Sequence, residues 1–134
     1  MAGAYELFKT DENLETKGVN LNYGDFSIRV ARAGGANKKY AKVFEAKIRP
    51  FRRAIQTDTM DPEVDRRIMA EVYAETVIIG WKGMKGQDGK ELAFNKANVV
   101  KVLTDLPDLF ADIIGQANQV SVFRADEAEV DAKN

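Results

Sequence analysis

The sequence predicts an α+β fold that is mostly α, with an N-terminal β-hairpin followed by about four helices. Between Val19 and Ala31, apolar and polar residues alternate in two short runs, as they do in half-buried strands. From Tyr40 to Val120, the apolar residues instead recur every three or four positions, which is the period of amphipathic helices. With 134 residues, of which 45% are hydrophobic and 31% charged, the chain is long and apolar enough to bury a core of its own.

We expect the chain to have three parts. Residues 1–16 form an N-terminal segment with few large apolar side chains. Residues 17–123 form a single globular domain, because no internal repeat and no linker interrupts them. Residues 124–134 are polar and acidic, and this composition predicts a disordered tail.

The two alternating runs form the predicted hairpin. The first spans Val19–Tyr23 and the second Phe26–Ala31, and Gly24–Asp25 between them supplies a turn. Because an isolated hairpin is only marginally stable in water, its apolar face must pack on other elements.

The next predicted element is a kinked, basic helix. Asn37 can cap its start, and Pro50 removes a backbone hydrogen bond inside it, which kinks or ends the helix. The basic residues fall mainly on the face opposite the apolar stripe. That stripe has helical spacing and consists of Tyr40, Val43, Phe44, Ile48, Phe51 and Ile55.

A central core helix is expected after Asp61–Pro62, an acidic cap followed by proline at the first helical position. Its second half, Val72–Trp81, is apolar on several sides, and Gly80 supplies a natural end. This segment should therefore lie at the centre of the core.

Shorter elements follow the core helix. Trp81–Met84 and Glu91–Phe94 flank an Asp-Gly turn signal, which predicts either a second short hairpin or an ordered loop. Asn95 can cap a short helix, and Asp105 with Pro107 can open a last one.

The composition argues against an enzyme. The chain has no cysteine and no histidine, so it lacks thiolate chemistry, zinc–sulfur sites and the commonest general base. Its glycine-rich stretches do not match a phosphate-binding loop. Its paired carboxylates have structural explanations, such as Asp61 and Glu63 at a helix N-terminus. We therefore expect no catalytic residue, no metal site and no cofactor.

The sequence contains no sign of export or membrane insertion. The N-terminus lacks a basic stretch followed by an apolar core, and no apolar run approaches the ~18 residues of a membrane helix. We expect a protein that stays in the cytoplasm and contacts no membrane.

Charge is distributed unevenly along the chain. Nine bases and one acid lie from Arg29 to Arg53, whereas seven acids and two bases lie from Asp105 to Asn134. This asymmetry favours head-to-tail association of copies, although two solvated faces explain it equally well. The basic helix also allows nucleic-acid binding through phosphate contacts. However, its aromatic residues fall on the apolar stripe and the pI is about 5.6, and both argue against nucleic acid.

From Glu75 to Asn95, a predicted helix runs into a tryptophan, and a glycine-rich stretch then ends in Asp-Gly-Lys-Glu-Leu-Ala-Phe. In Asn98–Phe110, a leucine, an acid, a hydrophobic residue and a proline precede the last helix. Both segments resemble the tail assembly chaperones of long-tailed (siphovirus-type) phages. The resemblance spans Val19–Phe123 and is strongest over Tyr73–Phe110.

The resemblance implies a binding role. Proteins of that family coat the long helical tape measure protein, keep it soluble, and help to recruit tail tube subunits, in some cases through a longer form made by frameshifting. It implies a homo-oligomeric chaperone of the host cytoplasm that is absent from the mature virion. A structural tail component, and a nucleic-acid-binding module that uses residues 38–53, are the alternatives.

The residues that we expect to meet a partner are large apolar or basic side chains. They are Tyr5, Leu7 and Phe8 in the N-terminal segment, Lys38, Lys39, Lys42, Arg49, Arg52 and Arg53 on the basic helix, and Trp81.

Overall fold

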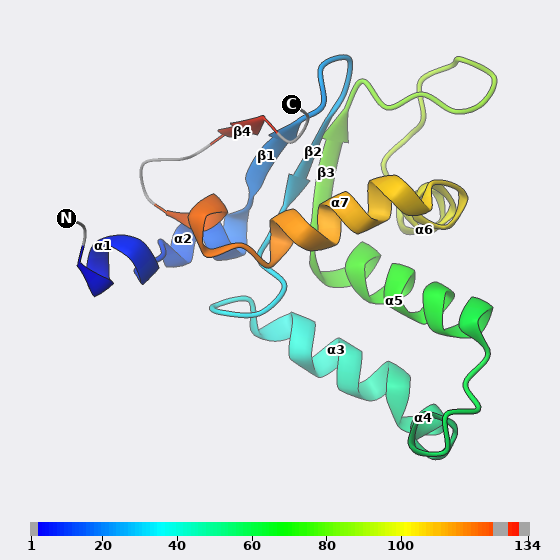
Figure 1. The fold of residues 1–134 in the computed structure, drawn as a ribbon. Helices are drawn as coiled ribbons and strands as arrows, with labels where there is room; N and C mark the ends of the chain where they lie inside the picture. Colours follow the sequence, from blue (N-terminus) through cyan, green and yellow to red (C-terminus); the bar gives the residue numbers. More distant parts are fainter. Residues whose placement is uncertain (1–2, 125–128, 132–134) are drawn as a thin grey trace.

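The fold class is the predicted one, α+β with helices predominating (Figure 1). The computed structural model describes residues 3–124 and 129–131. None of the helices described there is long and apolar enough to cross a membrane. The elements in chain order are α1 (Ala4–Phe8), α2 (Glu12–Lys17), β1 (Val19–Asn22), β2 (Ser27–Val30), α3 (Lys38–Ile48), the 3-10 helix η1 (Arg49–Phe51), α4 (Arg52–Gln56), α5 (Pro62–Thr76), β3 (Ile78–Lys82), α6 (Lys96–Asp105), α7 (Pro107–Ala117), the 3-10 helix η2 (Val120–Phe123) and β4 (Glu129–Asp131).

One layer of the molecule is a sheet with the strand order β3-β2-β1-β4. β1 and β2 form the predicted hairpin, in which they pair antiparallel with Val19 opposite Val30 and Asn22 opposite Ser27. β3 joins β2 in the antiparallel sense, and β4 joins β1 in the parallel sense. The N-terminal hairpin is therefore confirmed and forms the middle of a larger sheet.

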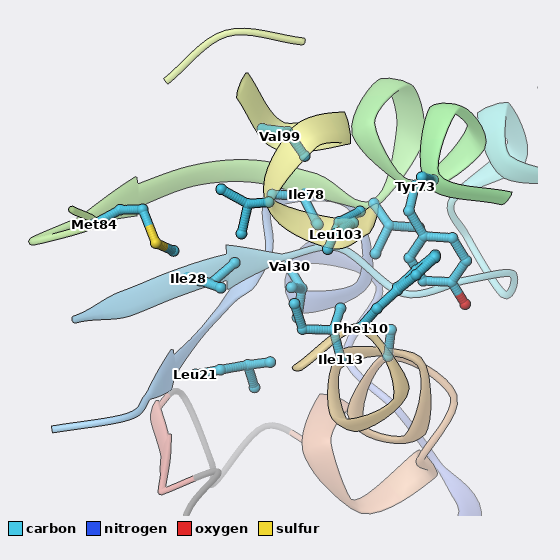
Figure 2. Packing of buried hydrophobic residues seen from close by; sticks show 14 residues of the cluster. Leu21, Ile28, Val30, Tyr73, Ile78, Met84, Val99, Leu103, Phe110 and Ile113 are labelled. Carbon is cyan, nitrogen blue, oxygen red and sulfur yellow. The ribbon is translucent and has the colours of Figure 1, made fainter. Parts of the chain in front are cut away.

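The second layer consists of helices α5, α6 and α7, which lie over one face of the sheet (Figure 1). In this layer the rings of Tyr73 and Phe110 meet edge to face, with their centres 5.3 Å apart. The apolar face of the hairpin packs against these helices, as the marginal stability of an isolated hairpin requires. Figure 2 shows the resulting core, whose buried residues include Leu21, Ile28, Val30, Ile78, Val99, Leu103 and Ile113.

The predicted core helix is too long at its C-terminal end. α5 stops at Thr76, and Ile78–Lys82 forms strand β3 instead of another helical turn. Three consecutive β-branched residues start at Val77, and such residues fit a pleated strand better than a helix. The strand pairs its backbone with β2 and buries Ile78 in the core, so Gly80 lies inside a strand and Trp81 near its end.

Several predicted helix boundaries are confirmed. The Asp61 side chain accepts a hydrogen bond from the backbone N–H of Glu63 at 2.9 Å, and α5 begins with the following proline. Asn95 caps α6 by accepting from the N–H of Asn98 at 2.8 Å. Pro50 lies in η1, which separates α3 from α4 and forms the predicted kink.

Two expected helix caps take other partners. Asp105 ends α6 and accepts a hydrogen bond from Lys101 Nζ at 3.0 Å, and the cap position of α7 falls on Leu106, whose apolar side chain cannot cap. Asn37 occupies the cap position of α3, but its side chain makes no capping hydrogen bond there. Neither predicted cap is therefore formed.

The two ends of the chain carry elements that we did not predict. The N-terminal segment forms α1 and α2, and Asp11 caps α2 by accepting from the N–H of Asn13 at 2.8 Å. In the segment 124–134, where we expected a disordered tail, Glu129–Asp131 form β4 along β1. The expectation for residues 125–128 and 132–134 lies outside the described residues.

The segment between β3 and α6 is an ordered loop rather than a second hairpin. Lys85 and Glu91 form an isolated bridge, and the N–H of Leu92 donates to the carbonyl of Met84 at 2.8 Å. Gly83 opens this loop with φ +73°, a left-handed conformation that glycine adopts without strain.

We expect Gly83→Ala to destabilise the fold much more than Gly89→Ala. Both glycines have a positive φ, so each substitution incurs backbone strain of about 1–2 kcal/mol. A Cβ at position 83 would also lie 2.6 Å from the backbone oxygen of Asp25, whereas a Cβ at position 89 meets open space. Urea unfolding of both variants measures the difference, and equal losses would contradict the close approach at Gly83.

Candidate protein-binding surface

The basic residues that we predicted as partner contacts form one exposed surface along α3, η1 and α4. We call this surface the basic ridge, and it consists of Lys38, Lys39, Lys42, Arg49, Arg52 and Arg53. Arg49 and Arg52 both reach Glu45, which neutralises part of their charge. Within the described chain, Lys38, Lys39, Lys42 and Arg53 have no acidic partner within ion-pair distance. The ridge therefore presents uncompensated positive charge to solvent.

The N-terminal end of the ridge is held by a buried polar network. The Glu15 carboxylate is buried and accepts hydrogen bonds from Arg32 and from the backbone N–H of Ala36. The Asn37 amide, also buried, donates to the carbonyls of Arg32 at 2.9 Å and Thr76 at 2.8 Å. Asn37 does not cap α3 because its side chain is engaged in these two bonds. They tie the start of the helix to the ends of β2 and α5.

The middle of the ridge is fixed on α5 by charge. Lys47 lies 3.3 Å from Glu71 and 3.2 Å from Glu75, and Lys96 of α6 reaches Glu75 at 2.9 Å. Burial alone would raise the pKa of Glu75, but hydrogen bonds from Lys96 and Lys47 outweigh it and lower that pKa. Burial alone would lower the pKa of Lys47, but its bonds to Glu75 and Glu71 raise it. The network thus favours the charged forms of Glu75 and Lys47.

The aromatic residues of α3 face the protein rather than solvent. Tyr40 packs edge to face on Tyr73 of α5, with ring centres 5.9 Å apart, and Phe44 stacks on Tyr40 at 6.1 Å. These side chains are engaged with the helical layer and offer no free platform for stacking bases. The exposed side of α3 is therefore basic rather than aromatic.

The three predicted residues of the N-terminal segment lie together on α1. Tyr5 is 83% exposed and Phe8 69%, and Leu7 is also exposed. α1 buries none of its residues and contacts the body of the protein mainly at η2. Large aromatic side chains gathered on one exposed element make α1 a candidate interaction surface.

Phe8 and Lys38, which we predicted on separate surfaces, line the same hollow. This hollow of about 650 Å³ lies between α1, α2 and the start of α3. Arg32 and Glu15 also line it, so the network that anchors α3 is part of its wall. The structure thus brings the N-terminal segment next to the basic ridge, which spacing along the sequence did not indicate.

Trp81 lies away from the basic ridge, near the end of β3. Its indole Nε1–H donates to the carbonyl of Leu92 at 3.0 Å, and its ring meets Phe94 edge to face at 5.3 Å. Phe94 remains 42% exposed, and sequence reasoning did not select it as a contact residue. The Leu-Ala-Phe ending of the glycine-rich stretch was the signal that could have found it.

A partly buried hydrogen-bonded pair, Tyr23 and Asp112, is structural. The Tyr23 hydroxyl donates to Asp112 at 2.6 Å, which ties the hairpin to α7. Burial, and then the hydrogen bond to Asp112, raise the pKa of Tyr23 far above its ordinary value, so the phenol keeps its proton. Among residues 3–124 and 129–131, no group of three or more acidic side chains is placed to hold a metal ion.

Comparison with known families gives the setting of these surfaces. Residues 35–134 match the family model of the YdaY prophage protein. The chain belongs to this family. It is therefore a phage-derived protein, as the resemblance to phage tail proteins implied at that coarser level. No curated protein and no solved structure matches the chain.

The match to the prophage family covers part of the candidate surfaces. It includes the whole basic ridge, Trp81 and the loop after β3, whereas α1, α2 and the hairpin lie before its start.

We expect Glu15→Gln to lower the free energy of unfolding by about 2 kcal/mol or more, because it leaves Arg32 without its counter-charge. Arg32 keeps 23% side-chain exposure, so the loss is smaller than for a fully buried pair. Glu12→Gln, on the exposed side of the same helix, is the control and should cost at most about 1 kcal/mol. Denaturant unfolding compares the two variants.

We expect the free energy of unfolding of Glu75→Gln to fall less at acidic pH than that of the wild-type protein. Because the folded protein lowers the pKa of Glu75, its stabilising effect is present above the unfolded pKa of about 4.3 and is lost as pH falls through the lower folded value. The wild-type protein should therefore lose more stability than the variant between about pH 5 and pH 3. Glu63→Gln, which removes an acid at the other end of α5, is the control. If the free energy of unfolding fell equally with pH in wild type and in Glu75→Gln, the prediction would be wrong.

Proposed function

We propose that this protein is a phage tail assembly chaperone. It binds the tape measure protein in the host cytoplasm, keeps it soluble, assists the recruitment of tail tube subunits, and is absent from the mature virion. Membership in a prophage family supports the phage setting. The resemblance of Glu75–Asn95 and Asn98–Phe110 to tail assembly chaperones supports the specific role. The proposal needs no catalytic residue and no cofactor.

The observation that carries the proposal is the exposed charge of the basic ridge. Lys38, Lys39 and Lys42 project from the outermost helix, with no acidic partner among the described residues. The ridge continues along η1 and α4, where Ile55 exposes an apolar side chain beside Arg52 and Arg53. A helical partner with acidic residues along one side and apolar residues next to them is complementary to this surface.

The position of α3 suits a helix laid alongside it. α3 packs on α5 through Tyr40 and the Lys47 ion pairs, and its basic side faces outward. A partner helix on that side would extend the existing helical layer without disturbing the core. Binding through this side needs no rearrangement of α3, whose start is fixed by Asn37.

The test is co-expression with the tape measure protein of the same prophage. Wild-type protein should raise the soluble fraction of the tape measure protein and should copurify with it. Lys39→Glu with Lys42→Glu should weaken this binding by about tenfold or more, because two attractive contacts become repulsive. Lys17→Glu with Arg66→Glu changes the net charge equally at two exposed positions outside the basic ridge, and should bind like wild type.

Two results would remove the proposal. One is a tape measure protein that stays insoluble in the presence of wild-type protein. The other is the recovery of this protein in stoichiometric amounts by mass spectrometry of purified virions, which would make it a structural tail component.

A further inference from the structure

We propose that copies of this chain assemble head to tail, with α1 of one copy seated against the Trp81–Phe94 loop of the next. The inference concerns self-association and does not depend on the identity of the partner of the basic ridge. It commits to a second copy of this chain as the occupant of both surfaces.

The inserting element is α1. Ala4, Tyr5 and Phe8 line one apolar face of this short helix, together with the stem of Lys9. Positions three and four apart share a helix face, so the two aromatic rings present a single contact surface. No residue of α1 is buried, and the element contacts the rest of the described chain mainly at η2, which leaves most of its apolar side chains exposed.

The receiving element is a hollow of about 370 Å³ beside the end of β3. Its apolar wall consists of Trp81, Met84, Leu92 and Phe94. The wall is fixed in place, because the Trp81 indole donates to the Leu92 carbonyl at 3.0 Å and the Leu92 N–H donates to the Met84 carbonyl at 2.8 Å. A preformed wall loses little conformational entropy when a ligand docks on it.

The charges at the rims of the two surfaces are complementary. α1 carries Glu6, and Lys9 follows directly after it, while the hollow is bordered by Lys82 and Glu91. All four side chains belong to exposed residues, and none of them forms an ion pair with another described residue. Each surface thus offers one acid and one base beside its aromatic side chains, so that Glu6 can pair with Lys82 and Lys9 with Glu91 across the interface.

The positions of the two surfaces dictate the kind of assembly. In Figure 1, α1 lies at one end of the molecule and the loop between β3 and α6 lies at the other. One copy cannot fill its own hollow, so each copy offers an arm to one neighbour and a hollow to another. Such a heterologous interface propagates into an open chain or closes into a ring.

The test is sedimentation velocity of the full chain over a wide concentration range. Wild-type protein should show a mass that rises above the 14.9 kDa of one chain as concentration increases. Tyr5→Ser with Phe8→Ser, and separately Phe94→Ser, should weaken self-association by more than about tenfold, which is typical of losing an aromatic anchor. Leu106→Ser, which changes a side chain that is 49% exposed outside both surfaces, is the matched control and should assemble like wild type.

Mixing the two defective variants gives a sharper readout. The α1 variant keeps its hollow and the Phe94→Ser variant keeps its arm, so their mixture should stop at a dimer of one copy each. Likewise, Lys9→Glu should weaken assembly, and adding Glu91→Lys to it should restore assembly. Circular dichroism spectra equal to wild type show that each variant is folded.

The outcomes separate the alternatives. A wild-type protein that stays monomeric up to about 1 mM, or variants that assemble as wild type does, would overturn the inference. If wild type is monomeric and Phe94→Ser loses binding to the tape measure protein, the hollow belongs to that partner. Lys39→Glu with Lys42→Glu leaves α1 and the hollow unchanged. Its effect on binding to the tape measure protein therefore tests the ridge proposal separately from self-association.

Discussion

The fold depends on how the chain satisfies the carbonyl groups where α5 ends and β3 begins. The last carbonyls of a helix have no partner within the helix, and burying them unpaired would be costly. Here the Asn37 amide donates to the carbonyl of Thr76 at 2.8 Å, and the backbone N–H of Ala31 donates to that of Val77 at 2.7 Å. These two bonds join the hairpin, the start of α3 and the end of α5 at a single point. The sheet and the helical layer are held together there by hydrogen bonds as well as by apolar packing.

Both candidate surfaces follow from that junction. On one side, the junction leads directly into β3. This strand contains Trp81, which lines the hollow together with Phe94. On the other side, the junction fixes the first turn of α3, while the ion pairs of Lys47 fix the middle. The basic ridge and the hollow are therefore parts of rigid elements on different sides of one framework. Rigidity at both sites reduces the entropy that binding must overcome.

Much of the fold could be predicted from sequence because its signals are local. The alternation around Val19, the Asp61 and Asn95 caps and the break at Pro50 each act over a few neighbouring residues. The wrong predictions share another cause. The apolar run after Thr76 is compatible with a helix or a strand, and pairing with β2, distant in sequence, decides between them. Asn37 looked like a cap for the same reason, since one of its two acceptors, the carbonyl of Thr76, lies 39 residues away. For the candidate site, composition pointed to the basic residues and to Tyr5, Leu7 and Phe8, but the helix that carries these three and the contact of Trp81 with Phe94 needed the structure.

The two proposals together give a physical reason why the basic ridge is separate from α1 and the hollow. A subunit that binds a long helical partner through a few exposed lysines gains little affinity alone, because exposed charge contacts are each weak. Subunits joined head to tail would present the basic ridge repeatedly, and each bound subunit would raise the effective concentration of the next. Many weak contacts would then hold the subunits firmly on the partner as a group. Each subunit could still leave singly, because each of its own contacts is easy to break. Such a coat of subunits can be displaced stepwise when tail tube subunits arrive, whereas one tight interface per subunit would resist removal. The absence of buried residues in α1 and the exposed ridge are what this balance requires of a single subunit.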